Sequence, residues 1–143
     1  MPRSKSLGDI VEIELPDGKK AYGRVYREYT VGIFNGFYGS VEELDISVGY
    51  YRFIGLYRTD LNKLRTAAKL PFSDTEDPWP PDKVVVDAIT GKGSLYHHGQ
   101  IFPCSYEECK NLEVCAVWHT YHVIDMLMGN EKWDKTIRKP LDV

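Results

Sequence analysis

The feature that most constrains the fold is a pair of β-patterned segments on either side of a tight-turn signal, Pro16-Asp17-Gly18. Residues 8–15 alternate close to the two-residue period of a strand with one well-buried face, and residues 21–27 resume that pattern. Gly18 can supply the positive φ that such a turn needs. Residues 8–27 are therefore predicted to form a β-hairpin. Gly23, in the middle of its second strand, predicts a bulge or a sharp bend, as in small closed barrels.

More β-patterned segments follow the hairpin. Residues 31–34 predict a third strand, 36–49 a glycine-punctuated acidic loop, and 50–58 an aromatic-rich strand. Between residues 60 and 72 the apolar residues keep helical spacing until Pro71. The three prolines within 73–81 exclude a strand there. Segments 83–89 and 94–102 then predict a second hairpin around a turn at residues 90–93.

The last third of the chain predicts helices. Ser105 and Glu108 have the spacing of a capping box, which predicts a short helix ending near Asn111. Residues 114–118 are compatible with a strand. Thr120 is then expected to cap a helix over 121–128, with Gly129 ending it. The polar tail 132–143 is expected to be loosely attached.

These segments predict one domain over residues 1–143, because 143 residues leave room for one domain of ordinary size. The expected fold class is mainly β (α+β). It consists of a bent, SH3-like N-terminal sheet and a second hairpin, with one or two C-terminal helices packed against them. The predicted core consists of Ile10, Ile13, Val25, Phe53, Ile54, Val85, Trp118, Val123 and Leu127.

The charge balance limits the function classes. Eighteen Lys and Arg against 21 Asp and Glu give a net charge of −3, which argues against a protein built mainly to coat nucleic acid or an anionic membrane. No apolar h-region follows the basic residues 1–6, and no run reaches the ~18 apolar residues of a membrane-spanning helix. We therefore expect a cytoplasmic protein without membrane partners.

Cysteines and histidines offer weak candidates for chemistry. The odd number of cysteines predicts reduced thiols, and Cys104, Cys109 and Cys115 lack the spacing of a structural zinc site. A nucleophilic pair of Cys109 or Cys115 with a histidine (His97, His98 or His119) would need a strained flanking turn, and none is visible. No metal, no cofactor and no catalytic residue is therefore expected.

Charge segregation is the most informative local feature. Two predicted loops carry seven acidic residues and no base: Glu42, Glu43 and Asp45 in the first, and Asp74, Glu76, Asp77 and Asp82, with Trp79 among them, in the second. They are either solvated surface or a docking face for a basic protein, with Trp79 as an aromatic anchor. Residues 52–69 carry five bases and one acid, which keeps a nucleic-acid-binding function open.

The ordered series of motifs resembles the immunity protein 26 family, bacterial proteins found beside polymorphic toxins. The segment from Glu107-Glu108-Cys109 to Trp118 is the most specific part, whereas residues 36–49 and 59–70 do not align with the pattern. The other matching motifs are Gly8-Asp9-Ile10-Val11, Leu15-Pro16-Asp17-Gly18, Ala21-Tyr22-Gly23-Arg24-Val25, Ile54-Gly55, Asp77-Pro78-Trp79-Pro80-Pro81, Thr90-Gly91, and His122-Val123 before Leu127.

The resemblance implies a mostly β, non-enzymatic protein that binds and neutralises a cognate toxin domain, such as a basic nuclease, by occluding its active site. It implies no catalytic residues. The alternative is a toxin ribonuclease of the PemK type, or an SH3-like nucleic-acid-binding module, since the Gly-Asp-Ile-Val opening is shared with that type. The ribonuclease alternative predicts that basic residues such as Arg24 or Arg52 are needed for activity.

Overall fold

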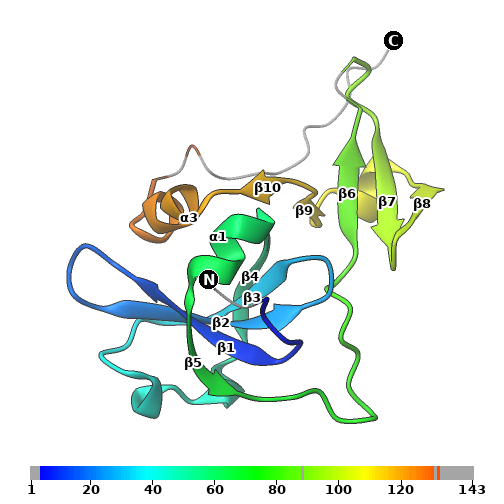
Figure 1. Ribbon diagram of the computed structural model, residues 1–143. Helices are drawn as coiled ribbons and strands as arrows, with labels where there is room; N and C mark the ends of the chain where they lie inside the picture. Colours follow the sequence, from blue (N-terminus) through cyan, green and yellow to red (C-terminus); the bar gives the residue numbers. More distant parts are fainter. Residues whose placement is uncertain (1–3, 88, 131, 133–143) are drawn as a thin grey trace. The chain divides into compact units, whose positions relative to one another are not determined.

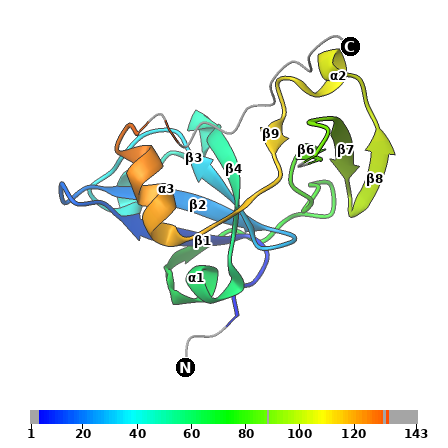
Figure 2. The ribbon, with the colours of Figure 1, turned by 90° about the horizontal axis from the view of Figure 1, so that it is seen from above.

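The computed structural model describes residues 4–87, 89–130 and 132, and the fold is mainly β (Figures 1 and 2). The chain divides into two compact units. Unit 1 contains the described residues of 1–80 and 117–133, and unit 2 contains those of 81–116. Of the predicted loose tail, 132–143, only Lys132 lies within the described residues.

Unit 1 is built on a six-stranded sheet in the order β10-β4-β3-β2-β1-β5. Strands β1 to β4 form an antiparallel meander, β5 returns antiparallel to β1, and β10 adds to β4 in parallel. This is the bent, SH3-like sheet that the sequence predicts. The strands are β1 (Asp9–Glu14), β2 (Lys20–Tyr26), β3 (Thr30–Phe34), β4 (Tyr50–Leu56), β5 (Arg65–Lys69) and β10 (Val117–Trp118).

The first hairpin forms as predicted. Gly18 has a φ of 85°, and its N–H donates to the Leu15 carbonyl at 3.1 Å. The prediction of a bulge at Gly23 is wrong, because its pairing with both neighbouring strands is regular. A Cβ at Gly23 would lie 2.1 Å from Cγ1 of Val31, so the glycine allows close packing between β2 and β3.

Strands β1, β2 and β3 are buried on both faces, whereas the sequence predicts one buried face for β1. Even Glu12 of β1 is buried, and its carboxylate accepts from the Tyr22 hydroxyl at 2.9 Å and pairs with Lys20 at 3.5 Å. Six predicted core residues are buried: Ile10, Ile13, Val25, Ile54, Trp118 and Val123. Phe53, Val85 and Leu127 are only partly buried.

Helix α1 (Arg58–Lys63) occupies only the start of the segment with helical spacing, and β5 takes the rest. The spacing therefore misleads after Lys63, because the free edge of β1 pairs with residues 65–69. Helix α3 (Thr120–Leu127) has His119 as its N-cap, so the prediction that Thr120 caps it is wrong. Gly129, with a φ of 97°, ends the helix as predicted.

Unit 2 contains a four-stranded sheet in the order β8-β7-β6-β9 and one short helix. The elements are β6 (Lys83–Val86), β7 (Gly93–His97), β8 (Gln100–Pro103), β9 (Glu113–Val114) and helix α2 (Tyr106–Cys109). The predicted strand 94–102 is two strands, because His98 and Gly99 form a tight turn with φ values of 45° and 80°.

The capping box of α2 is present, with Ser105 accepting from the N–H of Glu108 and Glu108 accepting from the N–H of Ser105. The helix ends at Cys109, two residues before the predicted end near Asn111. The predicted strand 114–118 is divided as well. Its first residue ends β9 of unit 2, and its last two form β10 of unit 1.

Candidate functional site

The first acidic segment lies in the loop between β3 and β4, which also contains two short 3-10 turns, η1 (Val41–Glu43) and η2 (Ile46–Val48). Asp45 caps η2 by accepting from the N–H and the hydroxyl of Ser47, at 2.9 and 2.7 Å. Glu43 accepts from the N–H of Gly39 at 2.7 Å. Glu42, Glu43 and Asp45 are all exposed, and none forms an ion pair within the described chain.

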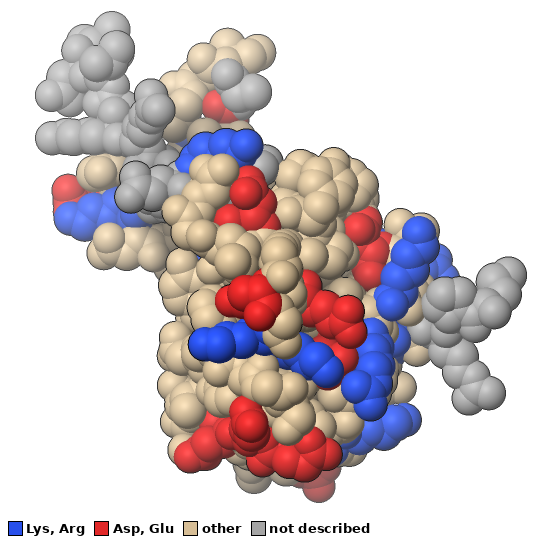
Figure 3. Space-filling view, turned by 90° about the vertical axis from the view of Figure 1, so that its left-hand side faces the viewer, with Lys and Arg blue, Asp and Glu red and all other residues tan. Residues whose placement is uncertain are grey.

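Acidic side chains gather along the lower part of the face that Figure 3 shows. The hydrogen bonds to Ser47 lower the pKa of Asp45, and a backbone hydrogen bond lowers that of Glu42. This loop therefore presents fixed negative charge to solvent near neutral pH.

The second acidic segment lies in the loop between β5 and β6, and its members have different surroundings. Glu76 forms hydrogen bonds that stabilise the fold. Its carboxylate accepts from the buried guanidinium of Arg24 at 2.9 Å and from the N–H of Ser73 at 3.0 Å. Arg24 also donates to the Leu70 carbonyl at 2.7 Å and lies 3.9 Å above the Phe72 ring. The hydrogen bond from Arg24 is the main reason that the pKa of Glu76 falls to about 2.

Glu76 is nevertheless exposed, and the other members of the second segment are exposed or half-buried. Asp74 and Asp77 are exposed, and Asp77 accepts from the Trp79 N–H at 2.9 Å. Trp79 is half-buried, with the Arg27 guanidinium 5.2 Å from its ring centre. Figures 1 and 2 both draw this loop apart from the 36–49 loop. Asp82, in unit 2, pairs with His97 at 2.6 Å.

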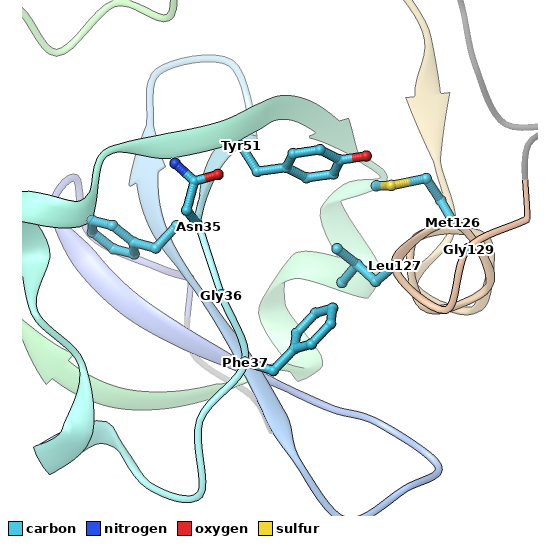
Figure 4. Close-up of a pocket in the computed structure, with 8 residues that line it drawn as sticks. Asn35, Gly36, Phe37, Tyr51, Met126, Leu127 and Gly129 are labelled. Carbon is cyan, nitrogen blue, oxygen red and sulfur yellow. The ribbon is translucent and has the colours of Figure 1, made fainter.

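A pocket that sequence reasoning missed opens in unit 1 between the start of the 36–49 loop, β4 and the end of α3 (Figure 4). Its volume is about 270 Å³. Its walls are mostly apolar and are formed by Phe34, Asn35, Gly36, Phe37, Tyr51, Met126, Leu127 and Gly129. No local pattern brings residues 34–37 and 126–129 together; the only signal is the unusual number of large apolar residues in and beside a predicted loop.

A second cluster joins α1 to the start of α3. Asp60 accepts from the N–H of Thr120 at 3.0 Å and contacts Nδ1 of His119 at 3.0 Å. The His119 ring stacks on Tyr57 and Tyr121, with ring centres 4.3 and 5.2 Å away. Burial alone would raise the pKa of Asp60, but the hydrogen bonds from Thr120 and His119 outweigh it and hold this pKa below its usual value.

This geometry gives Asp60 a structural role. Its carboxylate accepts from the N–H of Thr120, one of the first four N–H groups of α3, which have no carbonyl partner within the helix. The sequence carries no sign of this contact, because its partners are 60 positions apart.

The cysteines lie in unit 2. Cys109 is buried and donates to the Ser105 carbonyl, Cys104 is half-buried and Cys115 is exposed. Burial and the neighbouring Cys109 raise the pKa of Cys104 to about 11, so this thiol stays protonated at neutral pH. Within residues 4–87, 89–130 and 132, no three His, Cys, Asp or Glu side chains are grouped so that they could hold a metal ion.

Searching the same residues for a helix of the length and hydrophobicity needed to cross a membrane finds none. Comparison with protein-family models, curated proteins and solved structures finds no match to this chain.

Proposed function

We propose that this chain is a non-enzymatic immunity protein that binds a bacterial toxin domain in the cytoplasm and occludes its active site. The motif series from the Gly-Asp-Ile-Val opening to the Glu-Glu-Cys segment supports this proposal, because it resembles immunity proteins encoded beside polymorphic toxins. The SH3-like sheet of unit 1 is compatible with it.

The observation that carries the proposal is the charge of the 36–49 loop. Glu42, Glu43 and Asp45 are exposed, the loop contains no Lys or Arg, and each carboxylate lacks an ion pair within the described chain. A nuclease toxin must present a basic cleft to its substrate, and such a loop would mimic the phosphates that this cleft binds.

The second loop supports the proposal less strongly. Asp74, Asp77 and Trp79 remain candidates for the partner-binding surface, whereas Glu76 already has Arg24 as its partner. We therefore treat the two loops as separate candidate contacts.

The ribonuclease alternative has weaker support. Of the two basic residues that it would use, Arg24 is buried under the 70–76 segment, and the guanidinium of Arg52 lies 5.3 Å from the ring centre of Trp118. Changing either residue would therefore disturb the fold, so loss of activity in such variants would not identify a catalytic role.

Co-expression with the toxin domain encoded beside this chain tests the proposal. We expect the chain to restore growth of cells that express the toxin, and the purified chain to inhibit the purified toxin at a 1:1 ratio while cleaving no RNA itself. Failure to bind the toxin, or RNA cleavage by the isolated chain, would overturn the proposal. The charge-reversed variants described in the Discussion then decide which loop contributes.

A further inference from the structure

We infer that the pocket between the 36–49 loop, β4 and α3 accepts one large apolar side chain, carried on a basic segment of the toxin. This inference rests on the proposed function and gives it a docking point. Four properties of the pocket support it: its size and lining, its exposed rim, its fixed walls and the charge of the loop beside it.

The size and lining fit a side chain better than a metabolite. At about 270 Å³ the pocket lies just below the range of about 300–1,000 Å³ that is usual for small-molecule sites. Its lining offers the side-chain amide of Asn35 and the hydroxyl of Tyr51 as polar groups, and the amide already donates to the Val48 carbonyl at 3.0 Å. Small-molecule sites need several convergent polar groups for orientation, so this lining favours an apolar occupant.

The rim consists of large apolar side chains in solvent. Phe37 is 45% exposed and Tyr51 is 54% exposed, and Met128, next to the pocket residue Leu127, is also exposed. Figure 4 shows that Phe37 and Tyr51 reach toward α3 from separate segments of the chain. Central anchors in protein interfaces are commonly large side chains that fill pockets with aromatic walls.

Hydrogen bonds within the chain hold the backbone of both walls of the pocket. The Asn35 N–H donates to the Gly49 carbonyl at 3.0 Å and closes the base of the loop, and the Tyr38 hydroxyl donates to the Asn35 carbonyl at 2.6 Å. On the opposite side, the Gly129 N–H donates to the Met126 carbonyl at 3.0 Å and fixes the end of α3. A preformed pocket loses little conformational freedom on binding, which favours affinity.

Charge complementarity selects the class of occupant. The loop that forms one wall carries Glu42, Glu43 and Asp45 and contains no base. A segment that places a Leu, Met, Phe or Trp in the pocket would contact the start of this loop, and Lys or Arg flanking its apolar anchor would complement the negative charge of the loop.

Binding to the purified toxin domain tests the inference with a matched pair of tyrosines. Tyr51→Ser changes the rim, whereas Tyr29→Ser changes a tyrosine of similar exposure, 48%, in the turn between β2 and β3. We expect Tyr51→Ser to weaken binding by about 30-fold or more, as for an interface hot spot, and Tyr29→Ser to change it less than about 3-fold. Both residues are exposed, and circular dichroism melts verify that the variants are folded.

Site-specific photo-crosslinking identifies the occupant. p-Benzoylphenylalanine in place of Tyr51 should cross-link to a toxin peptide that combines Lys or Arg with a large apolar residue, and the same group in place of Tyr29 should not. If Tyr51→Ser binds the toxin as tightly as the wild type, the pocket is not a docking point, while the proposed function stays intact. Cross-linking of position 51 to this chain's own residues 133–143, which include Trp133 and three bases, would overturn the choice of occupant. A wild-type chain that does not bind the toxin would overturn both proposals.

Discussion

Trp118 is the side chain on which the junction of β10 with the sheet depends most. It is 4% exposed, Arg52 lies above its ring, and its carbonyl accepts from the Tyr57 N–H at 3.1 Å. We expect Trp118→Ala to lower the free energy of unfolding by about 3–5 kcal/mol, because it removes a fully buried ring. Urea denaturation measures this loss, with Trp79→Ala, a half-buried ring, as the milder comparison. An unchanged unfolding midpoint for Trp118→Ala would contradict the burial of its ring.

The Arg24–Glu76 pair makes stability depend on acid pH. The pKa of Glu76 falls from an ordinary 4.5 to about 2 in the folded chain, chiefly through its hydrogen bond from Arg24. A lowered folded pKa contributes stability above the unfolded pKa, and that contribution is lost as the pH falls from about 4.5 toward 2. Glu76→Gln should therefore unfold at lower temperature than the wild type at pH 6, and the difference should shrink by pH 2. Asp74→Asn, in the same loop, is the control, and a gap that persists at pH 2 would exclude this linkage.

The three thiols should differ in reactivity. Cys115 is exposed, Cys109 is buried, and the raised pKa of Cys104 keeps its thiol protonated. We expect a thiol reagent at pH 8 to modify Cys115 first, with Cys104 and Cys109 reacting much more slowly in the folded chain than in urea.

Elemental analysis of the same sample should find well under one zinc per chain. Stoichiometric zinc whose removal unfolds the protein would contradict the expectation of metal-free cysteines.

At the scale of elements, the close approach of β2 and β3 depends on Gly23. A methyl group there meets Cγ1 of Val31 at 2.1 Å, so Gly23→Ala should destabilise the chain by roughly 1–3 kcal/mol through overpacking. Val31→Ala removes the clashing atom. The double variant should therefore be more stable than the sum of the two single changes, and a thermodynamic cycle from urea denaturation measures this coupling. If the free-energy changes of the two single variants simply add, then β2 and β3 accommodate the extra methyl group without a clash against Val31.

Elements whose turn and cap residues lie within a few positions were predicted correctly from the sequence. Elements that depend on distant partners were predicted wrongly. The first hairpin, the capping box of Ser105 and the stop at Gly129 follow from turn and cap residues, which act within a few positions. Strand β5 forms because residues 65–69 pair with the edge of β1. This tertiary contact outweighs the helical spacing of the apolar residues in that segment. The His98-Gly99 turn was missed because His-Gly is not one of the usual two-residue hairpin signals, such as Asn-Gly and Asp-Gly.

At the scale of the molecule, the candidate site was predictable in charge but not in shape. A run of carboxylates is visible in the sequence, whereas the pocket combines residues 34–37, 51 and 126–129 only after the sheet and α3 have packed. For the same reason the sequence could not separate Glu76, whose partner Arg24 is 52 positions away, from the neighbouring carboxylates.

Reversing the charge of each loop separates their contributions to toxin binding. We expect Glu42, Glu43 and Asp45, all changed to Lys, to slow association with the toxin by about tenfold or more at low salt. The effect should shrink at high salt, because exposed charges are screened beyond about 8 Å at physiological ionic strength. Stopped-flow association rates measure it, with Asp74 and Asp77 changed to Lys as the second-loop test and Glu14→Lys as an exposed control. A triple variant that associates as fast as the wild type would make the first loop ordinary solvated surface.

The contact between Asp60 and the start of α3 makes the stability of that helix depend on a distant part of the chain. At eight residues, α3 is shorter than the ~12–15 residues that an isolated helix needs in water, and its capping carboxylate comes from 60 positions earlier in the chain. We therefore expect α3 to form only once the sheet and α1 support it. Since α3 forms one wall of the pocket, we expect the pocket to be lost in chains in which α3 has not docked, so a molecule that binds there would distinguish folded chains from partly folded ones.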